Sequence, residues 1–86
     1  MMVRAVFFAS LREAVDNDVL DVDIDDGGSL ADLRRCLATR LRPDQMAAID
    51  AADVRVAVNR RLVHDGEESV LSAGDEVAFM PPVTGG

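Results

Sequence analysis

The chain has 86 residues, of which 49% are apolar and 29% charged. This length and mixture indicate a single globular domain spanning residues 1–86 and exclude a disordered or collagen-like chain. Sixteen acidic residues against nine basic ones give a formal net charge of -7. Such a surface repels a phosphate backbone, so we expect no nucleic-acid partner and favour a basic protein surface instead.

The sequence offers no sign of membrane insertion or secretion. It holds no run of about 20 apolar residues that could span a bilayer, and its N-terminal apolar run lacks the cleavage site of a signal peptide. The single cysteine, Cys36, cannot form an internal disulfide. We therefore expect a cytoplasmic protein with no membrane partner. All nine basic residues are arginine, so no side chain carries an amine.

Two strands are predicted at the start of the chain. Val3–Ala9 is rich in β-branched and aromatic residues. In residues 20–24, Leu, Val and Ile alternate with aspartate, which is typical of a strand with one wet face. We expect these strands to pair antiparallel around the connection SLREAVDND, which contains a helical turn.

A helix is predicted after the turn Asp26-Gly27-Gly28. Ser29 and Asp32 have the spacing of a capping box. Leucines then recur at helical spacing at positions 30, 33, 37 and 41. These signals predict a helix of about 13 residues that ends before Pro43. The following segment PDQMAAID suggests a second, short helical turn.

Three further strands complete the expected fold. Valine alternates with other residues over 54–58, a short strand is expected near Leu62 and Val63, and Glu76–Met80 forms the last strand after the turn Ala73-Gly74-Asp75. The predicted order is β-β-α-β-β-β. It indicates an α+β fold, with a mixed sheet of four to five strands and one main helix on one face.

The alternation also assigns side chains to the two faces of the sheet. The residues expected to face the helix are Val3, Ala5, Phe7, Val54, Val56, Val58, Val77 and Phe79. The opposite face remains unexpectedly apolar, with Val6, Phe8, Ala57, Ala78 and Met80. Such a patch is a candidate interaction surface. Loops or a second copy could equally cover it.

The last six residues, 81–86, are predicted to form an extended tail. Pro81 and Pro82 lack a backbone N–H, so they end ladder pairing and lead the chain away from the sheet. Gly85 and Gly86 have no Cβ and can pass through a narrow channel, leaving the carboxylate of Gly86 open to attack. That carboxylate reacts only after activation, for example as an acyl adenylate made by an ATP-using partner. A frayed end without a role is the alternative.

The sequence contains no arrangement for catalysis by the chain alone. It has neither a Ser/His/Asp or Cys/His constellation nor a glycine-rich phosphate loop. His64 is expected in a solvent-facing loop without companion metal ligands, so no metal site is predicted. Cys36 is expected to be a partly buried thiol. The aspartates at 21, 23, 25 and 26 are interpreted as a solvated edge.

The stretches FFASLREAVD and GDEVAFMPPVTGG resemble the family of molybdopterin synthase small subunits, the sulfur carriers of molybdenum-cofactor biosynthesis. The resemblance implies a ubiquitin-like β-grasp fold. It also implies that an adenylyltransferase related to ubiquitin-activating enzymes uses ATP to activate Gly86, and that sulfur then gives a C-terminal thiocarboxylate. In a heterotetramer, the large subunit would use this sulfur to convert cyclic pyranopterin monophosphate to molybdopterin.

The resemblance assigns Gly86 and Gly85 to the reacting terminus and implies no bound cofactor. Residues expected to contact the large subunit are Phe8, Leu62, Met80, Pro81, Pro82, Val83 and Thr84. Three alternatives remain open at this point. They are a thiamine-pathway sulfur carrier, a non-covalent β-grasp interaction module, and a protein modifier whose Gly-Gly end is joined to amines.

Overall fold

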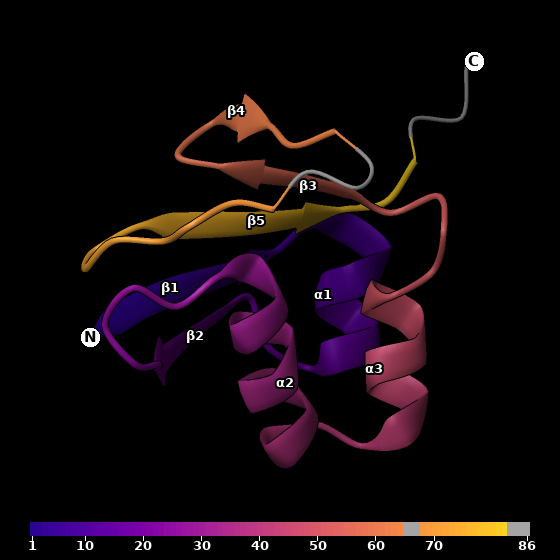
Figure 1. Cartoon of the computed structure of the whole chain (residues 1–86). Coiled ribbons are helices and arrows are strands. Elements are labelled where there is room, and N and C mark those ends of the chain that lie inside the picture. Colours follow the sequence, from indigo (N-terminus) through magenta and orange to yellow (C-terminus); the bar gives the residue numbers. More distant parts are fainter. Residues whose placement is uncertain (65–67, 83–86) are drawn as a thin grey trace.

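The computed structural model describes residues 1–64 and 68–82, in which a five-stranded sheet packs against helices on one face (Figure 1). The elements in chain order are β1 (Met2–Phe7), α1 (Ala9–Val15), β2 (Val19–Asp23), α2 (Leu30–Arg40), α3 (Pro43–Ile49), β3 (Arg55–Val58), β4 (Arg61–Leu62) and β5 (Glu76–Met80). The longest described helix, α2, has 11 residues, and no described helix could cross a membrane.

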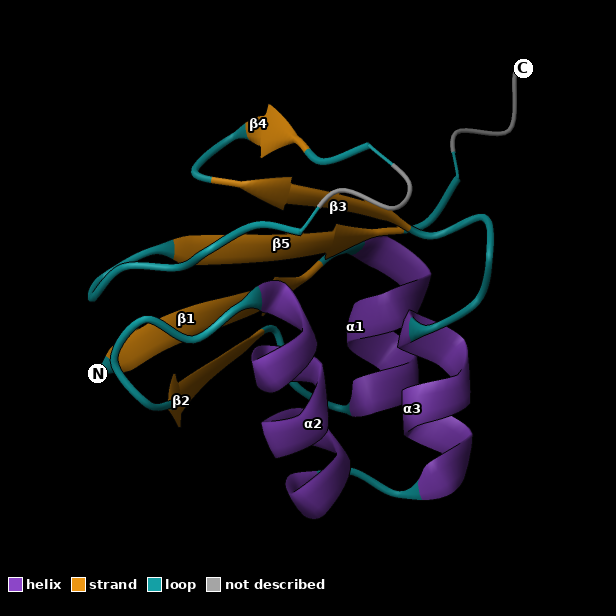
Figure 2. Cartoon of the chain, viewed as in Figure 1, coloured by secondary structure: helices purple, strands orange, loops and turns teal. Residues whose placement is uncertain are grey.

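The sheet is mixed, and its two central neighbours come from opposite ends of the chain. The strand order is β2-β1-β5-β3-β4. β1 pairs with β5 in parallel, whereas the other three pairings are antiparallel. Figure 2 shows β1 and β5 side by side, with the helices together beneath the sheet. Parallel pairing brings the end of β1 and the end of β5 to the same edge of the molecule.

These observations confirm the predicted fold class and the antiparallel pairing of the first two strands. The prediction was wrong about where β1 ends, because the chain turns at Ala9, with φ at 49°, and enters α1. The two expected helical turns are helices of seven residues, α1 and α3. Each buries only two side chains, which explains why their periodicity was weak in the sequence.

The capping box predicted for α2 is present. The backbone N–H of Asp32 donates to the Ser29 hydroxyl at 3.3 Å, and the N–H of Ser29 donates to the Asp32 carboxylate at 2.8 Å. Leu30, Leu33 and Leu37 are buried on the sheet-facing side. The helix ends at Arg40, since Leu41 adopts extended backbone angles before Pro43.

The core lies between the helices and the sheet. Six of the eight residues expected to face the helices are buried there, namely Val3, Ala5, Phe7, Val56, Val77 and Phe79. Val54 and Val58 are partly buried and pack against the same cluster. The predicted inner face is therefore correct. Burial of each of the larger side chains contributes about 1.5–3 kcal/mol relative to exposure.

Candidate functional site

A continuous row of apolar residues crosses all five strands on the face of the sheet that the helices leave open. Its members are aligned by strand pairing and are, from β2 to β4, Val19, Val6, Ala78, Ala57 and Leu62. Partners in register point to the same side of a sheet. The five side chains therefore lie in one line across the open face, and we call them the apolar row.

The middle of the apolar row is closed to solvent, whereas its ends are exposed. Ala57 and Ala78 are only 6% and 8% exposed. Leu62 at one end is 47% exposed and Val19 at the other is 39% exposed. The sequence prediction that the alanines contribute open surface is thus wrong, and the predicted set omitted Val19. Val19 directly precedes Leu20, so starting the predicted second strand one residue earlier would have identified it.

Phe8 and Met80 extend the apolar surface at the edge where β1 and β5 both end. Phe8 is 47% exposed and Met80 is half-buried. The backbone of Phe8 is fixed on both sides, because its N–H donates to the carbonyl of Phe79 at 3.1 Å and its carbonyl accepts from the N–H of Leu11 at 3.0 Å. The ring is therefore presented from a rigid junction. We refer to Phe8, Leu62 and Met80 as the docking face, after the role that the sequence predicts for them.

Charged residues border the apolar row on the side away from Phe8 and Met80. Arg4 lies in register with Asp21 and with Glu76. Its Nε donates to the Asp21 carboxylate at 3.1 Å, and this hydrogen bond, with the charge of Asp21, raises the pKa of Arg4. An apolar centre with a polar rim is the usual anatomy of a protein interface.

The predicted tail starts from the docking face. Pro81, which is half-buried, and Pro82, which is exposed, follow β5 without any strand pairing, as their missing N–H predicts. The four predicted site residues Val83, Thr84, Gly85 and Gly86 lie outside the described residues. Their roles stay predictions, whereas Phe8, Leu62, Met80, Pro81 and Pro82 lie among the described residues.

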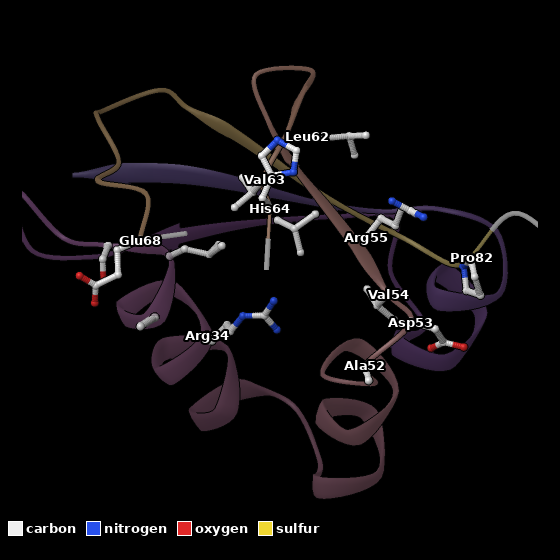
Figure 3. Close-up of a pocket in the computed structure, with 14 residues that line it drawn as sticks. Arg34, Ala52, Asp53, Val54, Arg55, Leu62, Val63, His64, Glu68 and Pro82 are labelled. Atoms are coloured by element: carbon white, nitrogen blue, oxygen red, sulfur yellow. The ribbon is translucent and has the colours of Figure 1, made fainter. Parts of the chain in front are cut away.

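A cavity of about 570 Å³ lies between α2, the segment before β3 and the end of β4 (Figure 3). Leu62 and Pro82 line it, as does the exposed His64. Arg34 points into it from α2, with its guanidinium 5.4 Å from the ring centre of Phe79 and in a salt bridge with Asp50. Arg34 therefore has a structural role, because both of its contacts lie within the fold. Over residues 1–64 and 68–82, no group of three or more His, Cys, Asp or Glu is placed to hold a metal ion.

Comparison with known proteins gives consistent likenesses over the full length. Residues 5–86 match the model of the ThiS family. The chain is 40% identical to the molybdopterin synthase sulfur carrier subunit of Escherichia coli, over 99% of this chain and 100% of the relative. It is 34% identical to small archaeal modifier protein 3 of Haloferax volcanii, over 100% of each. The crystal structure of SAMP1 from Haloferax volcanii has a TM-score of 0.82 at 27% identity and covers 100% of both chains.

These likenesses confirm the resemblance based on FFASLREAVD and GDEVAFMPPVTGG, and with it the ubiquitin-like β-grasp fold. The sheet order, the parallel pairing of the first and last strands, and the helices on one face agree with that fold. The chain therefore belongs to the ThiS family.

Proposed function

We propose that this protein is the sulfur carrier subunit of a molybdopterin synthase in the cytoplasm, and that the carboxylate of Gly86 carries the sulfur. The observation that supports this most directly is the 40% identity, over the full length, to a relative of that name. The geometry agrees, because parallel pairing of β1 and β5 brings Phe8, Met80 and the start of the tail to one edge.

The proposed chemistry needs two partners, since the chain itself carries no catalytic constellation in its sequence. An adenylyltransferase related to ubiquitin-activating enzymes uses ATP, and the Gly86 carboxylate displaces pyrophosphate to give an acyl adenylate. A persulfide sulfur then attacks the acyl carbon and AMP leaves. A thiol cleaves the remaining S–S bond, which leaves the thiocarboxylate. Sulfur suits this step because it is a strong nucleophile near neutral pH.

The large subunit then receives the tail and uses the sulfur of two carriers to build the dithiolene from cyclic pyranopterin monophosphate. In this arrangement the carrier supplies the reagent. The acids, bases and substrate pocket belong to the large subunit. No cofactor binds to the carrier, and ATP is used only by the adenylating partner.

The docking face and the tail have separate tasks in this proposal. Ordering residues 83–86 costs about 1–2 kcal/mol each in backbone entropy, so the tail alone is a weak anchor. Burial of Phe8, Leu62 and Met80 in the partner can contribute roughly 1.5–3 kcal/mol per side chain. The entropy cost of ordering the four tail residues and the gain from burying the three docking side chains are therefore of similar size. Stable docking therefore depends on the sheet face, and the tail delivers the reacting group.

Intact-mass analysis after incubation with the adenylating enzyme, ATP and a sulfur donor tests the proposal. We expect the mass shift of one oxygen replaced by sulfur, and no shift in a variant that lacks Gly86. A larger, amide-linked species would instead favour a protein modifier, for which the likeness to small archaeal modifier protein 3 is the supporting observation. An unchanged mass with an enzyme that modifies the Escherichia coli relative would overturn the proposal.

A further inference from the structure

The strand β2 lies at one end of the sheet, and its outer side has no strand partner among the described residues. It pairs with β1 on its inner side, and Figure 2 shows it as the outermost strand, near α2. The open edge of a sheet is a template for a further strand. The outer edge of β2 is therefore a candidate site for an extended segment of another molecule.

Two hydrogen bonds determine which peptide groups of β2 point outward. The N–H of Phe7 donates to the carbonyl of Asp18, and the N–H of Ile24 donates to the carbonyl of Met1, both at 2.9 Å. Hydrogen-bonded and non-hydrogen-bonded positions alternate along an antiparallel pair. Even-numbered residues of β2 therefore turn their peptide groups toward β1. The peptide groups that point outward belong to the odd-numbered residues, namely Val19, Asp21 and Asp23.

Side chains from α2 reach part of this outer edge. Nη1 of Arg40 donates to the carbonyl of Asp21 at 2.7 Å, and the thiol of Cys36 lies 4.0 Å from the carbonyl of Asp23. Within residues 1–64 and 68–82, no group accepts a hydrogen bond from the three outward N–H groups or donates one to the carbonyl of Val19. These three donors and this acceptor are available to an added strand.

The charge of the edge favours a basic segment. Residues 16–26 contain six aspartates and no basic residue. Asp21 and Asp23 are exposed and flank the buried Val22, so their side chains lie on the open face of the sheet. Arg4 contacts only one oxygen of Asp21, Oδ1, at 3.1 Å. A strand that places basic side chains beside these two carboxylates gains opposite-charge pairs across the new ladder.

The helix side of the same edge is apolar. Leu20 and Cys36 are half-buried there and pack against the core. The side chains of an added strand alternate between the two faces of the sheet. Those on the helix side meet Leu20 and Cys36, whereas those on the open face meet Asp21 and Asp23. The segment that fits this edge therefore alternates apolar and basic residues.

A second copy of this chain fits the edge poorly. If two β2 strands paired antiparallel about their central residue, the two Asp21 carboxylates would lie directly opposite each other. Like charges in opposed positions destabilise a sheet. Other registers still bring the aspartates of residues 16–26 from both copies into one short ladder. The charges that favour a basic segment thus disfavour self-pairing.

We propose that the outer edge of β2 binds an extended segment of a partner protein, in which basic residues alternate with apolar ones, by adding it as a further strand of the sheet. Arg40 occupies the Asp21 carbonyl until the added strand supplies an N–H there. This site lies at the opposite end of the sheet from β4 and Leu62. It therefore goes beyond the proposed function and does not depend on it.

The peptide acetyl-Lys-Val-Lys-Val-Lys-Val-amide is the probe, and it is titrated into the full chain while amide resonances are followed by NMR. The resonances of Val19, Asp21 and Asp23 should shift most, because their N–H groups point outward. The peptide with glutamate in place of lysine is the control for charge and should bind more weakly. Equal binding of the two peptides, no shift at these three residues, or shifts centred on the docking face would each overturn the proposal.

Two variants separate strand addition from attraction by charge alone. Asp21→Ala removes the carboxylate, whereas Asp21→Pro also removes the outward N–H, and proline is tolerated on an edge strand whose N–H faces solvent. We expect the lysine peptide to bind the proline variant about threefold or more weakly than the alanine variant, as the loss of one backbone hydrogen bond predicts. Equal dissociation constants would contradict strand addition. A dimer of the unmodified chain that Asp21→Pro dissociates would assign the edge to a second copy and overturn the proposal.

Methylated peptides test the same hydrogen bonds without changing the protein. Alternate N–H groups of an added strand face the β2 edge, and the others face solvent. One peptide is therefore N-methylated at its lysines and another at its valines. We expect one of these two peptides to lose binding and the other to retain it. Equal affinities of the two methylated peptides would contradict the proposal, even if the proline variant failed to fold.

Discussion

The rings of Phe7 and Phe79 stack on the helix-covered side of the sheet, with centroids 5.5 Å apart and ring planes 15° apart. These residues are partners in the parallel β1–β5 pairing. Because side chains alternate along extended backbone, the next residues, Phe8 and Met80, point to the opposite face. A single step along each strand thus separates the residues that stabilise the fold from those of the docking face.

The docking face is expected to control binding to the large subunit. Phe8→Asp or Met80→Asp places a charge where a partner buries an apolar side chain, so each should weaken binding roughly tenfold or more. Thermal unfolding should be nearly unchanged, because both residues are partly exposed. Titration calorimetry with the large subunit measures the loss. Val70→Asp is the control, since Val70 is 72% exposed but lies outside the docking face. Equal affinities for all three variants would rule the face out.

The stacked pair is expected to control stability instead. Phe79 is fully buried and its ring also lies against the guanidinium of Arg34. Phe79→Ala should lower the free energy of unfolding by about 3–5 kcal/mol through the lost contacts and the cavity left behind. Urea denaturation followed by circular dichroism measures this. Phe8→Ala is the comparison and should cost much less. Similar losses for the two variants would show that Phe8 belongs to the core.

Local patterns in the sequence predicted most elements of this fold, because each depends on residues that lie close together in the chain. Alternating valines identified β3, and the leucine spacing with Ser29 and Asp32 identified α2. The insertion of β5 between β1 and β3 is a non-local pairing that no local pattern encodes. The burial of Ala57 and Ala78 depends on the same pairing, since it makes the two alanines partners on central strands of the sheet.

The positions of Phe8 and Met80 on the open face were predictable for a different reason. Phe8 and Met80 are the large apolar residues left over once the inner face is assigned, and the tail is marked by Pro81. By contrast, the role of Gln45 could not be predicted. It is a polar residue in a short helix, yet it is only 7% exposed because it bridges α3 and α1.

Gln45 is expected to stabilise the contact between these two helices. Its side-chain amide donates to the carbonyls of Ala14 at 3.3 Å and Val15 at 3.1 Å, and its oxygen accepts from the N–H of Arg42 at 2.8 Å. Gln45→Leu would leave these groups without their partner and should lower the free energy of unfolding by about 1–3 kcal/mol. Urea titration measures the change. Met46→Leu in the same helix conserves volume and should cost less than about 1.5 kcal/mol. The reverse ranking would contradict the bridging role.

Removal of Gly86 is expected to separate sulfur transfer from binding. The deletion takes away the proposed acyl position, so dithiolene formation in a reconstituted synthase assay should stop. Affinity for the large subunit should change little, since the docking face remains. Gly86→Ala is the control, because it keeps a terminal carboxylate but adds a Cβ in the expected channel, and it should retain slower transfer. Dithiolene formation by the deletion protein would show that sulfur is carried elsewhere.

The capping box of α2 predicts a specific dependence of stability on pH. The backbone N–H and hydroxyl of Ser29 donate to the Asp32 carboxylate at 2.8 and 3.2 Å, and together with Arg35 they lower the pKa of Asp32. A lowered pKa in the folded state means that the carboxylate stabilises the fold above the ordinary aspartate pKa of about 3.9 and ceases to do so as the pH falls through the folded-state pKa.

Asp32→Asn should therefore have a lower melting temperature than the unmodified protein at pH 7, and the difference should shrink as the pH falls below about 4. Thermal melts recorded between neutral and strongly acidic pH measure it. Asp18→Asn removes an exposed carboxylate outside the helix and is the control for the change in net charge. Because Asn can still accept a hydrogen bond, the difference reports the charged form of Asp32. A gap between Asp32→Asn and the unmodified protein that stays constant down to acidic pH would show that this charge does not stabilise the helix start.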